Sequence, residues 1–260
     1  MTQLMRALAA WRHKQVREES AIVWAELREL REDIDKGTPP RDGPNVTLTV
    51  DGVDVSVPAG SSVMLAAAMA GKPVPKLCAT DMLEAFGSCR VCLVELEGRS
   101  GFPASCTTPV AEGMVVRTKS EDLLRLRKGV LELYLSDFPS GDIPGGWSEF
   151  HTVLDQVGVK THPYAPISNH LDAPIDSSNP YFLFDPAKCI VCSRCVRACE
   201  EIQGTFALTI DGRGFASKIV AGMHETFFES PCVSCGACVQ TCPTQALIEK
   251  SLFVGGYSRG

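Results

Sequence analysis

Residues 189–199 read C-I-V-C-S-R-C-V-R-A-C, and residues 232–243 read C-V-S-C-G-A-C-V-Q-T-C-P. Each stretch has the spacing C-x2-C-x2-C-x3-C, which holds [4Fe–4S] clusters in chains that carry two of them. Three cysteines of a run wrap one cluster, and the fourth ligates the cluster of the other run. The spacing therefore predicts two crossed ligand sets, which are Cys189, Cys192, Cys195 and Cys242 for the first cluster and Cys232, Cys235, Cys238 and Cys199 for the second.

A third set of four cysteines lies upstream, with the spacing C-x10-C-x2-C-x13-C: Cys78, Cys89, Cys92 and Cys106. All 12 cysteines of the chain thus fall into three sets of four. Iron in clusters prefers soft thiolate ligands, and the upstream set predicts one [2Fe–2S] site. Two alternatives remain open, because C-x2-C pairs also hold structural zinc. Disulfides would need an oxidising compartment, of which the sequence gives no sign.

The composition is that of a folded, acidic protein. The 260 residues are 45% hydrophobic and 22% charged, with a formal charge of −6. Each cluster with four thiolates carries about −2, which would bring the total to about −12 and argues against nucleic-acid binding. Four basic residues near the cysteine runs either offset the cluster charge and tune the potential, or are solvated surface charges. They are Arg90, Lys188, Arg194 and Arg197.

The sequence offers no candidate membrane anchor. The longest apolar stretch, residues 63–70, is far too short to span a bilayer, and the first residues lack the apolar core of a signal peptide. We therefore expect no membrane association and a cytoplasmic location.

Residues 1–44 predict a helical extension followed by a linker. Residues 2–36 contain neither glycine nor proline, and Val23, Leu27, Leu30 and Ile34 form one apolar stripe at helical spacing. The stripe either packs on the chain's own domain or docks on a partner subunit. We favour docking, because the Gly- and Pro-rich residues 37–44 separate the helix from the first domain.

The rest of the chain predicts an α+β fold with two domains. In residues 45–120, two alternating strands joined by Asp51-Gly52, a helix capped by Ser61-Ser62 and two return strands indicate a β-grasp [2Fe–2S] ferredoxin domain. Residues 121–180 begin with an amphipathic helix over 121–136 and continue from Phe138 as mostly irregular connector. Residues 181–250, with strands at 206–210 and 215–220, predict a two-[4Fe–4S] bacterial-ferredoxin-like domain, and residues 251–260 a tail.

Several segments resemble a known family. Residues 87–95, G-S-C-R-V-C-L-V-E, together with residues 103–106 and 112–116, resemble the N-terminal module of the large iron–sulfur subunit of respiratory complex I. The same module occurs in NAD-reducing hydrogenases and NAD-dependent formate dehydrogenases. Residues 178–185, S-N-P-Y-F-L-F-D, and the two cysteine runs resemble the N-terminal part of the molybdenum- or tungsten-containing NAD-dependent formate dehydrogenase large subunit.

Two departures change what the resemblance implies. The family has a further cluster ligated in H-x3-C-x2-C-x5-C form, where this chain has Phe138, Asp142, Gly145 and His151. We therefore expect that cluster to be absent and interpret His151 as an ordinary surface or loop histidine. The family's large subunit also continues into a molybdopterin-binding domain where this chain stops at Gly260, so we expect a partner to supply that domain.

The resemblance implies an electron-transfer subunit of a cytoplasmic NAD(P)-linked formate dehydrogenase complex, a hetero-oligomer. Single electrons would pass between a molybdenum- or tungsten-pterin catalytic subunit and a flavin- and NAD-binding diaphorase subunit. No residue of the chain is expected to act as an acid, base or nucleophile. The alternatives are the small diaphorase-type subunit of an NAD-reducing hydrogenase, a free ferredoxin-like carrier and a zinc-binding scaffold.

Overall fold

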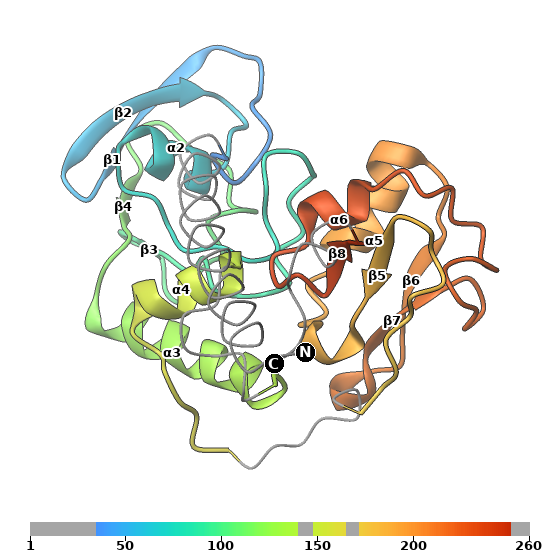
Figure 1. Cartoon of the computed structure of the whole chain (residues 1–260). Coiled ribbons are helices and arrows are strands. Elements are labelled where there is room, and N and C mark those ends of the chain that lie inside the picture. Colours follow the sequence, from blue (N-terminus) through green and yellow to red (C-terminus); the bar gives the residue numbers. More distant parts are fainter. Residues whose placement is uncertain (1–34, 140–147, 165–171, 251–260) are drawn as a thin grey trace, which may run out of the picture.

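The computed structural model describes residues 35–139, 148–164 and 172–250. Figure 1 shows strands β1–β4 with α2, α3 and α4 on one side of the molecule, and β5–β8 with α5 and α6 on the other. The predicted α+β fold, a β-grasp domain followed by a dicluster ferredoxin-like domain, is confirmed.

The β-grasp domain is a mixed four-stranded sheet in the order β2-β1-β4-β3. Strand β1 pairs antiparallel with β2 and parallel with β4, which pairs antiparallel with β3. Asp51 and Gly52 both have positive φ, 46° and 80°, as a two-residue hairpin of the predicted kind requires. The strands and the helix that packs on them are β1 (Asn45–Val50), β2 (Val53–Pro58), β3 (Glu95–Leu96), β4 (Val115–Arg117) and α2 (Val63–Met69).

Helix α3 (Glu121–Ser136) has the predicted bounds. The Ser120 hydroxyl caps its first turn by accepting a hydrogen bond from the Leu123 N–H. Leu131 and Leu135 on its inner face are buried in one apolar cluster with Leu77, Cys78, Cys89 and Val91 of the β-grasp domain. The helix therefore lies directly against the loop that carries the upstream cysteines.

Helix α4 (Glu149–Val157) lies within a segment that the sequence predicted to be mostly loop, and the sequence analysis missed it. Phe150, Val153, Leu154 and Val157 form its buried face, at helical spacing. The helix is short and lies in a segment rich in proline and glycine, so its helical spacing was not recognised in the sequence. The interpretation of His151 as a surface or loop histidine is also wrong, because His151 is a buried residue of α4 whose Nδ1 lies 2.7 Å from the Ser148 hydroxyl.

The second domain is closed by its two ends. Strand β5 (Phe182–Phe184), before the first cysteine run, pairs antiparallel with β8 (Leu247–Glu249), after the second. Between them lie η2 (Pro186–Lys188), α5 (Arg194–Arg197), η3 (Ala198–Gln203), β6 (Leu208–Asp211), η4 (Gly214–Ala216), β7 (Lys218–Ala221) and α6 (Ala237–Thr241). Each cysteine run thus wraps into the same small core.

The hairpin of β6 and β7 differs in detail from the prediction. Strand β6 starts at Leu208, because Phe206 has a positive φ of 56° that a β-strand cannot contain. Residues 214–216 form η4, so β7 begins only at Lys218. In the turn between them, a Cβ on Gly212 would lie 2.2 Å from the Ala216 carbonyl oxygen, which makes glycine necessary there.

The start of the described chain packs on the β-grasp domain. The Asp35 carboxylate pairs with Lys76 at 2.9 Å and accepts the Asp81 N–H at 2.9 Å, and the Thr38 hydroxyl lies 2.7 Å from that of Ser62. Part of the predicted linker is therefore fixed. The predicted helix in residues 2–36 and the tail at 251–260 lie outside the described residues, apart from residues 35 and 36. In the ranges that the structure describes, no helix has the length and apolarity to cross a membrane.

Two leucines of α3 provide a matched test of this packing. Leu131 is fully buried, whereas Leu133 is 50% exposed. We expect Leu131→Ala to lower the free energy of unfolding by about 2–5 kcal/mol, because it leaves a cavity in the core. Leu133→Ala carries the same change in helix propensity and should cost about 1 kcal/mol or less. Anaerobic urea titrations of both variants measure the difference, and equal losses would contradict the described orientation of α3.

Candidate metal centres

The four upstream cysteines converge, and all are buried. Hydrogen bonding from the Cys106 and Cys89 thiols lowers the pKa of Cys78, and hydrogen bonding from Cys106 lowers the pKa of Cys92 to about 7. The same contacts raise the pKa values of Cys89 and Cys106. The contacts join the four sulfurs into one buried group, which is the number of ligands that one [2Fe–2S] cluster takes.

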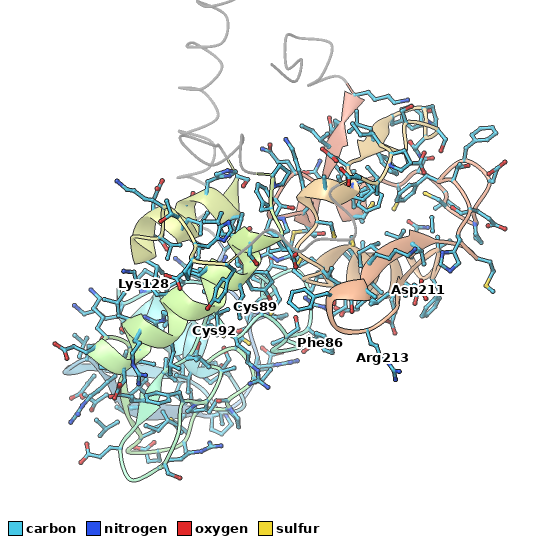
Figure 2. All side chains as sticks on the ribbon, turned by 90° about the horizontal axis from the view of Figure 1, so that it is seen from below. Phe86, Cys89, Cys92, Lys128, Asp211 and Arg213 are labelled. Carbon is cyan, nitrogen blue, oxygen red and sulfur yellow. The ribbon has the colours of Figure 1, made fainter. Side chains whose placement is uncertain are left out.

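Backbone hydrogen bonds and one buried arginine hold the loop around this quartet. The Cys89 N–H donates to the Cys78 sulfur at 3.5 Å, and Gly87 has a φ of 74° where a Cβ would crowd Thr107. Arg127 of α3 is buried and donates to the carbonyl oxygens of Val91 and Leu93, at 3.2 and 2.6 Å. Figure 2 shows the loop with Cys89 and Cys92 close beside α3.

Each predicted [4Fe–4S] quartet lines a cavity of its own. The empty space at the two sites, including the part that opens to solvent, is about 310 Å³ and about 320 Å³. The first is lined by Cys189, Cys192, Cys195 and Cys242, and the second by Cys199, Cys232, Cys235 and Cys238. The fourth cysteine of each run therefore lies with the other run, as crossed ligation requires, although ligation itself stays a prediction.

The two cysteine runs share one backbone conformation. Val191 and Ser234, at the same place in each run, both have positive φ, and each N–H lies 3.4 Å from the sulfur two residues before it. The Ala207 N–H donates to the Cys199 sulfur at 3.3 Å. Such N–H groups stabilise negative charge on sulfur, so both cavities suit an anionic cluster.

The three quartets form a contiguous series. Cys192 lies close enough to Cys78 for their charges to interact. Tyr134 lies near both quartets, since burial and the charges of Cys89 and Cys192 raise the pKa of its hydroxyl. Burial raises the pKa of Cys238 to about 12 together with the charges of neighbouring cysteines, among them Cys242 of the other [4Fe–4S] quartet. The quartet with Cys192 thus lies between the other two.

Two of the four predicted basic residues, Arg194 and Arg197, are buried, so they are not solvated surface charges. Both belong to α5 and reach into the β-grasp domain. Arg197 donates to the carbonyl oxygens of Cys78 and Glu84, and its guanidinium lies 5.9 Å from the ring centre of Phe86. In Figure 2, Phe86 is drawn where the two domains meet. Arg90 is exposed and Lys188 is half-buried.

Arg194 forms a bidentate ion pair with Glu149 of α4, at 2.6 and 2.7 Å. Burial lowers the pKa of Arg194, but the charge of Glu149 and its hydrogen bonds outweigh burial and raise it. In the same way burial raises the pKa of Glu149, and the charges of Arg194 and Lys76 outweigh it. Both groups are therefore held in their charged forms.

The sequence analysis missed Arg127, Tyr134 and Glu149. The sequence pattern could have indicated that Arg127 is buried, because this charged residue lies four positions from both Leu123 and Leu131 on the apolar face of α3. No sequence pattern indicated the role of Glu149, since its partners Arg194 and Lys76 are 45 and 73 residues away in the sequence.

The family comparisons agree with this geometry. Residues 43–121 match the family described as "2Fe-2S iron-sulfur cluster binding domain", and residues 188–246 match the "4Fe-4S dicluster domain". All 12 cysteines are free thiols and none forms a disulfide. The chain is thus an iron–sulfur protein with one [2Fe–2S] and two [4Fe–4S] clusters, which confirms the predicted cofactors in place of zinc.

A solved relative establishes the family. A chain in the crystal structure of an NAD+-reducing [NiFe]-hydrogenase in the H2-reduced state matches with a TM-score of 0.69 and 30% identity, over 83% of this chain and 90% of that one. The chain belongs to the family of iron–sulfur electron-transfer subunits that includes this hydrogenase chain, which confirms the resemblance drawn from the sequence.

Curated relatives share the same region. The NADP-reducing hydrogenase subunit HndD of Solidesulfovibrio fructosivorans is 37% identical over 78% of this chain and 36% of its own length. A Staphylococcus haemolyticus protein provisionally named as a formate dehydrogenase, SH0748, is 28% identical over 80% of this chain and 21% of its own length. The chain therefore spans about a third of the first and about a fifth of the second.

Iron content distinguishes crossed from uncrossed ligation. The intact chain should hold about ten iron atoms. If ligation is crossed, Cys189→Ser with Cys242→Ser removes ligands of one cluster and leaves about six, whereas Cys232→Ser with Cys242→Ser disables two clusters and leaves about two. Uncrossed ligation reverses the two results. Anaerobic iron and sulfide analysis of the two double variants measures this, and each serves as the control for the other.

Proposed function

We propose that this chain is the electron-transfer subunit of a cytoplasmic NAD(P)-linked oxidoreductase complex. The observation that carries the proposal is the contiguous series of three cysteine quartets, with Cys192 near Cys78 on one side and Cys242 near Cys238 on the other. When bound, the clusters supply one-electron oxidation and reduction. The chain holds them in a fixed order.

Apolar side chains surround cysteines of both the upstream quartet and the first [4Fe–4S] quartet. Cys78, Cys89 and Cys192 belong to one apolar cluster, together with Phe138, Phe150 and the inner face of α3. In contrast, Cys235 of the last quartet is exposed. A buried series that opens to the surface at one end suits a subunit that exchanges electrons with a protein docked at that end.

We propose formate as the electron source, with carbon dioxide reduction as the reverse reaction. Residues 178–185 and the two cysteine runs support this, because they resemble the formate dehydrogenase branch of the family. The provisionally named S. haemolyticus protein aligns over the same region. The partners would then be a molybdenum- or tungsten-pterin catalytic subunit and a flavin- and NAD-binding diaphorase subunit, in a hetero-oligomer.

A second candidate is the diaphorase-type iron–sulfur subunit of an NAD-reducing hydrogenase. The match to a chain of that enzyme, over 83% of this chain and 90% of that one, favours this candidate. The cluster sites would act in the same way in both complexes. The difference lies in the catalytic partner, which would oxidise hydrogen in place of formate.

Electron paramagnetic resonance of the native complex distinguishes the two sources. We expect formate to produce the signals of reduced [2Fe–2S] and interacting [4Fe–4S] clusters in the complex purified anaerobically. Hydrogen producing them instead would move the assignment to the hydrogenase. Signals that appear with dithionite alone would overturn both sources. A complex carrying Cys92→Ser is the control, and it should lose the [2Fe–2S] signal while retaining the others.

Removing the N-terminal segment tests whether the chain works as a docked subunit. The deletion should stop at residue 34, because Asp35 and Thr38 are bonded to the β-grasp domain. We expect the shortened chain to keep its iron and to lose co-purification with its partners, whereas a free carrier would keep its activity. Full-length Leu27→Asp, in the apolar stripe, should act like the deletion, and Arg28→Ala, outside it, should not.

A further inference from the structure

Arg194 is fully buried between two cysteines of the first run and uses nearly all of its donors. Its Nη1 donates to a Glu149 carboxylate oxygen and to the Thr241 carbonyl oxygen, at 2.6 and 3.2 Å. Its Nη2 donates to the other Glu149 oxygen and to the Ala79 carbonyl oxygen, at 2.7 and 2.6 Å. A guanidinium has five N–H groups, so these bonds occupy four of them.

The fifth donor, the Nε–H, is buried and has no hydrogen-bond partner among the residues that the structure describes. A buried donor without a partner costs roughly as much as a lost hydrogen bond, so its position calls for an acceptor. Arg194 also lines the cavity that is enclosed by Cys189, Cys192, Cys195 and Cys242. The acceptors that this cavity would contain are the sulfur atoms of a bound cluster.

The second cysteine run lacks this group. Cys238 corresponds to Cys195, so Ala237 stands where Arg194 stands in the first run, and Gly236 where Ser193 stands. Val191 and Ser234 nevertheless give the two runs equivalent N–H bonds to sulfur. The two cavities therefore differ in one buried cation and its free donor, as well as in the exposure of Cys235 in the second.

We propose that the Arg194 Nε–H donates to a sulfur of the cluster in this cavity and, with Glu149 fixing the guanidinium, sets that cluster's reduction potential above that of the other [4Fe–4S] cluster. The inference rests on the proposed ligation by Cys189, Cys192, Cys195 and Cys242. Reduction adds negative charge, which a hydrogen bond and a nearby cation stabilise. Glu149 is thus the positioning residue, and Arg194 helps to determine which [4Fe–4S] cluster is reduced first.

The proposal makes opposite predictions for the two members of the ion pair. Arg194→Gln removes the cation and the donor and leaves the Glu149 carboxylate with Lys76 alone as its counter-charge, so the potential should fall. Glu149→Gln removes the negative charge and leaves Arg194 without its counter-charge, while Lys76 keeps Asp35, so the potential should rise. A merely structural role would disturb the same interface in both variants and would move the potential in the same direction.

The experiment is redox potentiometry followed by electron paramagnetic resonance on the full-length chain in its complex. Cys199→Ser with Cys232→Ser is the background, because it should remove the other [4Fe–4S] cluster and leave one to observe. Arg197→Gln is the matched control, since Arg197 is a buried arginine of the same helix that lines neither [4Fe–4S] cavity. It should shift the potential of this cluster much less than Arg194→Gln does.

Electron–nuclear double resonance in H2O and D2O gives a second readout. One exchangeable-proton coupling to the reduced cluster should disappear in Arg194→Gln and persist in Glu149→Gln. Shifts in the same direction for both variants, a shift no larger than that of Arg197→Gln, or an unchanged set of couplings would each overturn the proposal. If the background variant retains no [4Fe–4S] cluster, the proposed ligation fails instead, so the two failures are distinguishable.

Discussion

The arrangement of the whole molecule depends on the buried ion pair between Arg194 and Glu149. It joins three separate parts of the chain: the first cysteine run, helix α4 and, through the Ala79 carbonyl, the loop after Cys78. Lys76 extends the pair to Asp35 at the start of the described chain. Because Arg194 is fully buried and the other charged groups of this network are at least partly buried, the upstream quartet and the first [4Fe–4S] quartet have a fixed spacing.

Burying such a pair is costly unless nearly every donor and acceptor is used, because both charges lose their hydration. Removing one partner of a buried pair typically costs about 3–5 kcal/mol, since an uncompensated charge is left behind. Two leucines of similar volume could pack here at a lower cost in desolvation free energy. A hydrophobic replacement, however, would supply neither the directional bonds to Ala79 and Thr241 nor a positive charge beside four thiolates.

The features that could be predicted from the sequence are the local ones. The cysteine spacing, the Asp51-Gly52 turn and the stripe of α3 are each encoded within a few residues, and the structure contains the turn and the helix as expected. Helix α4 was missed because its nine residues are too few to stand out within an irregular composition. The partners of Arg194 and Arg197 could not be predicted, because the carbonyl groups of Ala79 and Cys78 that they bind lie more than 100 residues away and have no signature in the sequence.

Aromatic side chains pack around Phe138, which stands at the position of the family's histidine ligand. Phe138, in place of the histidine, is buried with its ring centre 5.0 Å from Phe150 and 5.8 Å from His151. An unfilled space there would cost about 24 cal/mol for each Å³, so aromatic side chains are a stable replacement. Phe138 and Phe150 belong to the same apolar cluster as Cys78, Cys89 and Cys192, so apolar side chains surround these cysteines of two cluster sites. A low local dielectric strengthens each remaining charge, and this makes the single guanidinium of Arg194 an effective determinant of potential.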